Sequence, residues 1–220
     1  MRRASPELGL IALLAALTLA FGWRAEHFLS AETLRTVANQ LPDALLLATG
    51  MTLVLLVGGI DLSVGSVLGL AVATLGWGAR LGWPLPVAAA AAVAAGGLCG
   101  LGNALLVVRF RLPAFLATLG MFEAARGAAY LLAESRTQYL GSAATRWSDA
   151  SLAGFSAPLL FALAVAAAAQ WALSRTVAGR DLLAVGGGEE ASHLAGVPVG
   201  RVKAGAYVLS GLLALSLIHI

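Results

Sequence analysis

The stretch Gly58-Gly59-Ile60-Asp61-Leu62-Ser63-Val64-Gly65-Ser66 decides the fold, because it interrupts an apolar run that extends from residue 41 to residue 78. That run is nearly twice as long as the roughly 20 residues that cross a bilayer as one helix. Glycines and polar side chains within the stretch favour a tight turn or a broken helix. We therefore predict two membrane helices, 41–59 and 63–79, that meet at this stretch.

The composition is that of a membrane protein. Of the 220 residues, 60% are hydrophobic and 11% are charged, whereas soluble domains carry about 25% charged residues. At about 20 residues per span plus short loops, the length has room for about six to eight helices and excludes a sizeable soluble domain. We predict an all-α membrane protein, a polytopic transmembrane helix bundle in a single domain 1–220. Its spans are 8–23, 41–59, 63–79, 84–108, 113–133, 157–173 and 204–220.

The first apolar run, 8–23, allows two interpretations. It follows a basic start and is short for a span, so it could be a signal peptide with a weak cleavage site at Ala20-Phe21-Gly22. An uncleaved first helix is favoured, because a protein with many spans rarely needs a separate signal. The polar segment 24–40 predicts a short helix in the outer interface.

The basic residues predict the sidedness of the loops. With the N-terminus in the cytoplasm, the inner segments hold eight basic residues: Arg2, Arg3, Arg109, Arg111, Arg175, Arg180, Arg201 and Lys203. The outer segments hold five: Arg24, Arg35, Arg80, Arg136 and Arg146. The positive-inside rule favours this arrangement. The loop 134–156 is then outside and the loop 174–203 cytoplasmic, and the net charge of +3 reflects topology rather than binding of nucleic acid.

The sequence gives no support for an enzyme. Lys203 is the only lysine and follows Val202, so the chain has no Gly-Lys-Ser/Thr phosphate loop. The histidines His27, His193 and His219 are too scattered for a metal cluster. We predict no catalytic residue, no metal and no cofactor.

Asp61 has two interpretations, because an acid at membrane depth usually has a partner or a purpose. It can cap the second helix by accepting hydrogen bonds from the amides of Ser63 or Val64. Alternatively, the break forms a gate or faces a substrate. The glycines Gly58, Gly59 and Gly65 permit the close backbone approach that either role requires.

Two charges in the span 113–133 also have two interpretations. Glu123 and Arg126 are three residues apart and share a helix face, and neither should face lipid. They form a structural ion pair, within the helix or to a neighbour, or they contact a polar permeant. The Gly-xxx-Gly spacings of Gly65 with Gly69 and of Gly96 with Gly100 predict close helix packing.

The cytoplasmic loop contains a short, well-delimited helix. Three glycines, Gly186 to Gly188, precede Glu189-Glu190-Ala191-Ser192-His193-Leu194-Ala195, which places acids at the positive end of a helix. Gly196 and Pro198 end it. A chain without a nucleotide-binding site could use this short helix as the contact through which a separate ATPase moves it.

Several blocks resemble the permease subunits of bacterial ATP-binding-cassette (ABC) importers for monosaccharides of the ribose, xylose, arabinose and galactose group. They lie in order along residues 28–214: Gly50 to Val54 with Gly58 to Ser66; Leu112 to Gly120 with Arg126-Gly127; and Gly179-Arg180, Ala184 to Gly187, Glu189-Glu190-Ala191, Leu194 to Val197 and Arg201 to Lys203. Glu190, Ala191, Ser192 and Gly196 match the importer pattern Glu-Ala-Ala-x-x-x-Gly, with Ser192 in place of the second alanine.

The resemblance implies a passive path in the bacterial inner membrane, driven by an ATP-binding subunit under the cytoplasmic loop. It also implies a periplasmic sugar-binding protein, which the outer loop with Tyr139, Arg146 and Trp147 could help to dock, and a second permease copy. The residues implied in coupling to the ATPase are Gly187, Glu189, Glu190, Ala191, Ser192 and Gly196. The candidates for the translocation path or gate are Gly59, Asp61, Ser63, Gly65, Ser66, Thr118, Glu123 and Arg126.

The resembled family continues with further spans after residue 214, so the resemblance also predicts a C-terminally truncated chain with a non-native tail at 215–220. Three alternatives stay open. The permease could serve a nucleoside or a branched-chain amino acid, or the chain could be a truncated fragment that does not transport. A secondary transporter would show paired, inverted halves, and only one break of this kind is present.

Overall fold

The computed structural model describes residues 6–134, 136 and 150–214. Its contacts divide the chain into two compact units, 1–40 and 41–220. The first unit contains α1 (Pro6–Arg24) and α2 (Ala31–Asn39). Ser30 caps α2 by accepting a hydrogen bond from the Thr33 amide at 3.2 Å. Helix α2 confirms that 24–40 contains a short helix, and its Leu34 and Val37 side chains are exposed; its place in a membrane interface stays a prediction.

The second unit begins with two helices on either side of the break. These are α3 (Pro42–Leu56) and α4 (Val64–Arg80). The Gly58 amide donates to the Leu55 carbonyl at 3.0 Å and the Gly59 amide to the Val54 carbonyl at 2.9 Å. This pair of bonds is the Schellman ending of a helix, which places Gly58 in the left-handed region at φ +73°. The glycines therefore end α3 in the way that the sequence predicts.

The next helices cover the predicted spans 84–108 and 113–133, and of these two the first is among the described helices that are long and apolar enough to cross a membrane. Helix α5 (Leu85–Ala104) continues as a π-helical turn, η1 (Leu105–Arg109), and α6 (Ala114–Ala133) follows after Pro113. Within the described ranges, two helices are long and apolar enough to cross a membrane: the continuous helix 85–109 and α8 (Ala157–Arg175). Helices α1 and α4 are shorter apolar helices.

A small β-hairpin, absent from the prediction, precedes α8. Strands β1 (Ser151–Leu152) and β2 (Phe155–Ser156) pair antiparallel, with Ser151 opposite Ser156 and Leu152 opposite Phe155. Ala153 and Gly154 both have positive φ, as a two-residue hairpin turn requires. The outer-loop residues Tyr139, Arg146 and Trp147 lie outside the described residues.

The loop 174–203, which is predicted to be cytoplasmic, contains one helix that the sequence did not predict. Helix α9 (Val177–Gly187) begins at Thr176, whose hydroxyl accepts a bond from the Gly179 amide at 3.1 Å. It runs into the glycines that were expected to form a loop, because Leu182 and Val185 are buried against the core. Helix α10 (Glu189–Leu194) follows, and α11 (Val199–Leu213) begins at Val199 rather than at residue 204. The predicted tail 215–220 lies outside the described residues.

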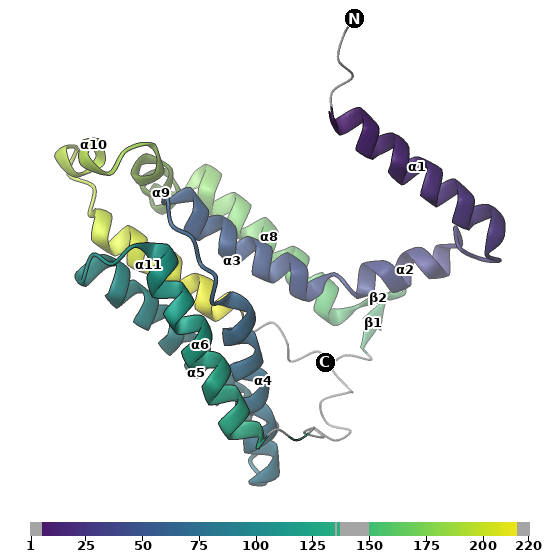
Figure 1. Ribbon diagram of the computed structural model, residues 1–220, viewed down its shortest axis with the longest axis horizontal. Helices are drawn as coiled ribbons and strands as arrows, with labels where there is room; N and C mark the ends of the chain where they lie inside the picture. Colours follow the sequence, from purple (N-terminus) through teal and green to yellow (C-terminus); the bar gives the residue numbers. More distant parts are fainter. Residues whose placement is uncertain (1–5, 135, 137–149, 215–220) are drawn as a thin grey trace, which may run out of the picture. The chain divides into compact units, whose positions relative to one another are not determined.

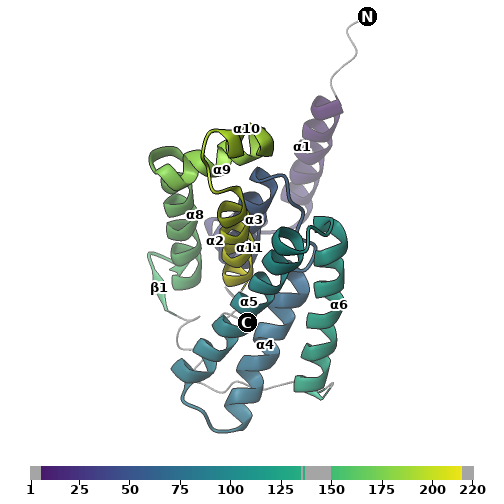
Figure 2. The ribbon, with the colours of Figure 1, turned by 90° about the vertical axis from the view of Figure 1, so that its left-hand side faces the viewer.

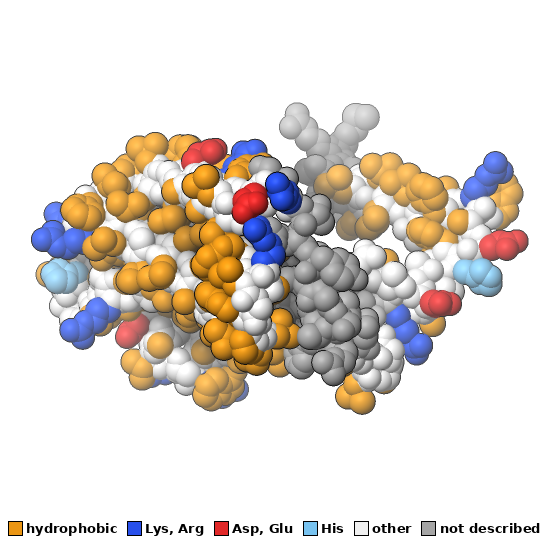
Figure 3. All heavy atoms as spheres, turned by 90° about the horizontal axis from the view of Figure 1, so that it is seen from below, with side chains coloured by type: hydrophobic (Ala, Val, Ile, Leu, Met, Phe, Trp, Pro, Cys, Tyr) orange, Lys and Arg blue, Asp and Glu red, His pale blue; other side chains and the backbone are white. Residues whose placement is uncertain are grey.

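Helix α11 is the centre of the packing in the second unit. It packs against α5 and α3, α4 packs against α5 and α6, and α8 packs against α3 and α9. Figures 1 and 2 both show α11 alongside α3 and α5. Many large apolar side chains stay exposed, and Figure 3 shows hydrophobic side chains spread over much of the described surface, with charged side chains among them. Such a surface suits lipid contact.

Glycines bring α5 and α11 into close contact. A Cβ atom on Gly211 would meet the Gly96 carbonyl oxygen and the Gly100 backbone, and one on Gly100 would meet the Tyr207 backbone. The pair Gly96 and Gly100 therefore packs as its spacing predicts. The prediction for Gly65 and Gly69 is wrong, because open space faces both positions.

We expect Gly211→Ala to separate α5 from α11, because the new methyl group meets backbone atoms that cannot rotate away. Overpacking of this kind costs about 1–3 kcal/mol. The matched control is Gly205→Ala on the same helix, where a Cβ meets nothing within 4 Å and the added alanine favours the helix. Thermal unfolding in detergent should show a lower midpoint for Gly211→Ala alone. Equal midpoints in the two variants would contradict the close packing.

Candidate functional site

The break between α3 and α4 is built around the buried side chain of Asp61, which is 2% exposed. Its Oδ1 atom accepts hydrogen bonds from the Ser63 amide at 2.9 Å and the Ser63 hydroxyl at 2.6 Å. Its Oδ2 atom accepts one from the Ser210 hydroxyl of α11 at 3.0 Å. The predicted bond from the Ser63 amide is present, and the bond from α11 is an addition to it.

Two further helices donate to the same break. The Asn103 amide of α5 donates to the Ser63 hydroxyl oxygen at 2.8 Å. The Thr118 hydroxyl of α6 lies 3.1 Å from the Ile60 carbonyl oxygen and 2.9 Å from the Ala114 carbonyl of its own helix, and shares its hydrogen between them. The break is thus tied to α5, α6 and α11 at once.

Sequence reasoning missed Asn103, Ser210 and Tyr207 as parts of this site. Asn103 and Ser210 are 1% exposed and Tyr207 is fully buried. Asn103 is an isolated polar side chain in the apolar helix α5, and that isolation was the available signal. Helix α11 also carries Arg201 and Lys203, so Tyr207 and Ser210 did not stand out in the same way. Among the described residues, Asn103 Oδ1 and the Tyr207 hydroxyl are buried without a hydrogen-bond partner.

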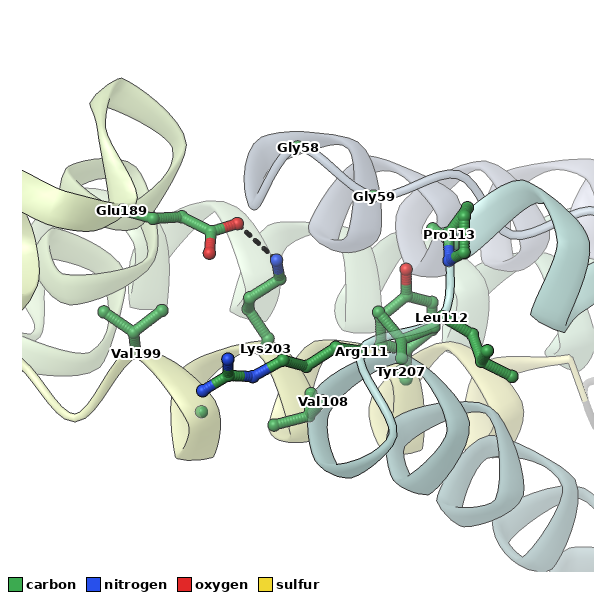
Figure 4. Close-up of a pocket in the computed structure, with 13 residues that line it drawn as sticks. Gly58, Gly59, Val108, Arg111, Leu112, Pro113, Glu189, Val199, Lys203 and Tyr207 are labelled. Carbon is green, nitrogen blue, oxygen red and sulfur yellow. Dashed lines mark hydrogen bonds and ion pairs between the residues drawn. The ribbon is translucent and has the colours of Figure 1, made fainter.

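A cavity of about 550 Å³ opens beside the break. Gly58 and Gly59 line it on one side, and Arg111, Lys203 and Tyr207 line it on others. Figure 4 shows the Tyr207 hydroxyl directed toward the glycine segment. It also shows the ion pair between Lys203 Nζ and Glu189 Oε1, which joins α11 to α10 at the rim of the cavity.

The predicted coupling residues lie in and around α10. Gly187 ends α9, Glu189 begins α10, and Glu190 and Ala191 are exposed, whereas Ser192 is 5% exposed. The Gly196 amide donates to His193 and the Val197 amide to Ser192, each at 3.0 Å.

These two bonds form a Schellman ending with Gly196 at φ +84°. The final glycine of the Glu-Ala-Ser-x-x-x-Gly pattern is therefore required by backbone geometry. The Leu194 side chain next to this ending is 83% exposed, so α10 presents both an acidic and an apolar group on its free surface.

A second cavity of about 620 Å³ lies between α4 and α6. It collects three of the predicted path residues, Gly65, Ser66 and Arg126. The Arg126 guanidinium lies 5.9 Å from the ring centre of Tyr130, within cation–π range. Open space at Gly65 and Gly69 widens the cavity on the α4 side.

Glu123 lies apart from this second cavity. It is exposed and does not line the cavity. The ion pairs that the structure gives for the described part of the chain are Arg80–Glu134 and Lys203–Glu189, so an ion pair between Glu123 and Arg126 is not formed. In the first of these pairs, Arg80 Nη2 donates to Glu134 Oε1 at 3.0 Å. The hydrogen bond and the charge of Arg80 lower the pKa of the Glu134 carboxyl.

These features define the class of protein to which the chain belongs. Apolar helices with exposed apolar surfaces, and a buried polar break between two of them, are typical of a helical membrane protein. Within the described residues no group of three or more His, Cys, Asp or Glu side chains could hold a metal ion.

Comparison with known protein families identifies the family within this class. The family described as "Branched-chain amino acid transport system / permease component" matches residues 33–215. The chain belongs to this family.

The chain is also similar to permease proteins of autoinducer 2 import systems. The autoinducer 2 import system permease protein LsrC of Enterobacter sp. (strain 638) is 38% identical over 188 residues, covering 85% of this chain and 55% of the relative. LsrC of Escherichia coli O9:H4 (strain HS) is 33% identical, covering 93% of this chain and 61% of the relative.

LsrD of Salmonella paratyphi B is 32% identical, covering 96% of this chain and 65% of the relative. The chain therefore spans somewhat over half the length of these relatives. No solved structure matches it.

We expect Ser210→Ala to destabilise the fold, because it removes the only described donor to Asp61 Oδ2. Leaving such a buried oxygen without its donor costs about 1–3 kcal/mol. Ser174→Ala is the control, since Ser174 is an exposed serine that bonds only within α8. Thermal unfolding in detergent should separate the two variants. A Ser210→Ala protein as stable as the control would show that this hydrogen bond does not hold the break.

Proposed function

We propose that the chain is a membrane permease subunit of an ABC importer and helps to form the path for a monosaccharide-type solute. The observation that carries the proposal is α10, a short helix with a defined beginning and a glycine ending, which presents Glu190, Ala191 and Leu194 to the outside of the protein. Family membership and the relatives named as import permeases support it.

The proposed topology follows the basic residues. The chain acts as one membrane domain in the bacterial inner membrane, with about seven spans and a cytoplasmic N-terminus that stays uncleaved. The loop 174–203 then lies in the cytoplasm, where α10 meets an ATP-binding subunit. The excess of Arg and Lys on this side supports the arrangement.

The remaining partners are a periplasmic solute-binding protein and a second permease copy. Helix α6 supports the second copy. Glu123 and Arg126 are exposed on it, and open space faces Gly120 and Gly127. Charged groups at this depth are costly against lipid, so protein or a water-filled path covers this face when the subunit works.

The path candidates divide into two sets with different roles. Gly59, Asp61, Ser63 and Thr118 belong to the buried break and act as a gate. Gly65, Ser66 and Arg126 line the open cavity between α4 and α6 and contact the solute. Glu123 is exposed on α6 apart from this cavity, and it belongs to the face of α6 that we propose the second copy covers. ATP-driven closure of the partner would move α10 and rock the helices between inward-open and outward-open states.

We expect Glu190→Lys, or deletion of 189–195, to abolish uptake and binding of the ATP-binding subunit while leaving membrane insertion intact. The reason is that α10 supplies the exposed contact and the variant reverses its charge. Glu32→Lys on α2 is the control, because it makes the same charge change in the first turn of another helix. Co-purification of the ATP-binding subunit measures the effect. An undiminished yield after the deletion would contradict the coupling role.

The solute class is tested with the complete importer in proteoliposomes. We expect ATP-dependent uptake of a labelled monosaccharide such as ribose, or of autoinducer 2, the solute in the names of the relatives. Leucine and uridine represent the alternative solutes, and the description of the family names branched-chain amino acids. Uptake of leucine or uridine without uptake of the first two would overturn the solute class and leave the importer role standing.

A further inference from the structure

A continuous set of contacts joins α10 to the break between α3 and α4. It begins at the ion pair of Glu189, the first residue of α10, with Lys203 of α11. The Lys203 side chain is 17% exposed and the Glu189 side chain 54%. Partial shielding from water strengthens such a pair relative to a fully exposed one.

Lys203 shares one face of α11 with the two residues that contact the break. Tyr207 is four residues further along and Ser210 seven, the spacing of neighbours on a helix face. At about 1.5 Å per residue, Ser210 lies about 10 Å from Lys203 along the helix axis. Movement of one end of this short rigid segment therefore displaces the other.

Tyr207 contacts Gly59, two residues before Asp61, and Ser210 contacts Asp61 itself. The Tyr207 ring is fully buried, and a Cβ on Gly59 would collide with its hydroxyl. Ser210 donates to Asp61 Oδ2 at 3.0 Å. The break cannot keep these contacts if α11 shifts by a few ångströms.

A second contact runs from the cytoplasmic loop to the other flank of the break. A Cβ on Gly186 of α9 would collide with the carbonyl oxygen of Leu56, the last residue of α3. Leu182 and Val185 of α9 belong to the same buried cluster as Val54, Val57 and Tyr207. Helix α9 is thus packed on α3, whereas the ion pair of Glu189 with Lys203 joins α10 to α11.

We infer that Lys203 is a positioning residue that transmits displacement of α10 through Tyr207 and Ser210 to the Asp61 break, and so opens or closes the path. This inference rests on the proposed function. In this role Lys203 acts through α11 and not by contact with solute or nucleotide. Lys203 makes the position of the break depend on the position of α10. The break then has two arrangements, and displacement of α10 favours one of them.

The test uses the complete importer with Lys203→Met, Glu189→Gln, and the exchange Glu189→Lys with Lys203→Glu. We expect each single change to lower solute uptake per ATP hydrolysed at least fivefold, with the ATP-binding subunit still bound. The exchange should restore most of the uptake, because it rebuilds an ion pair. Arg201→Met is the control: it removes a cation from an exposed position on the same helix, and uptake should stay unchanged.

A second measurement follows the break itself. Ile60 lies in the break and is 44% exposed, so Ile60→Cys in a Cys99→Ala background gives one site for a maleimide. We expect its labelling rate to change at least threefold when the ATP-bound state is trapped. With Lys203→Met the rate should no longer follow the nucleotide.

Two outcomes overturn the inference: normal uptake per ATP in Lys203→Met, or labelling at residue 60 that still follows the nucleotide in that variant. Failure of the exchange to restore uptake also counts against it. Failure of the proposed function is distinguishable, because the wild-type importer would then bind no ATP-binding subunit or take up no solute.

Discussion

The second unit depends on the burial of one carboxyl group, that of Asp61, at a point where a helix has been broken. A carboxylate away from water is costly unless hydrogen-bond donors surround it. Here the donors come from Ser63 on its own segment and from Ser210, which is distant in the sequence. The break therefore exists only while α11 is in place, and α11 is held in turn by the break.

Close backbone approach is what makes this arrangement possible. Ser210 can reach Asp61 because glycines stand where α11 meets its neighbours. A Cβ on Gly50 of α3 would lie 3.1 Å from the Ser210 Cα atom, and a Cβ on Gly211 would collide with α5. A larger residue at either position moves α11 outward and takes the Ser210 hydroxyl away from the carboxyl. The close packing of α11 and the hydrogen bond to Asp61 therefore depend on each other.

Local features of this protein could be predicted from sequence, and long-range ones could not. The end of α3 at Gly58 and the end of α10 at Gly196 depend on glycines at fixed offsets, and a single sequence shows these directly. Helix α9 was not predicted because the glycines at its end favour a loop. The burial of Leu182 and Val185, which stabilises the helix, depends on helices that are distant in the sequence. The partners of Asp61 are distant in the sequence. Ser210, which donates to Asp61 directly, is 149 residues away, and Asn103, which donates to Ser63, is 42 residues away.

The ion pair predicted between Glu123 and Arg126 is not formed in the described part of the chain, for the same physical reason. Spacing shows that Glu123 and Arg126 share a face of α6, but the side chains choose among all available partners. Arg126 lies over the Tyr130 ring beside an open cavity instead. Lys203 found its carboxylate on another helix, fourteen residues earlier in the chain. Whether two charges form an ion pair depends on how the helices pack, and the spacing of residues along one helix does not show which other helix lies beside it.

The break lies between the loop 174–203, from which α11 begins, and the open cavity between α4 and α6. Ser210 ties it to α11, which begins at the loop, and Thr118 ties it to α6. Eight residues further along α6, about 12 Å at about 1.5 Å per residue, Arg126 lines the cavity between α4 and α6. Helix α4 itself starts at the break and forms the other wall. A small shift of the Asp61 segment therefore changes the position of both walls, and a polar network at this point can control a cavity that it does not line.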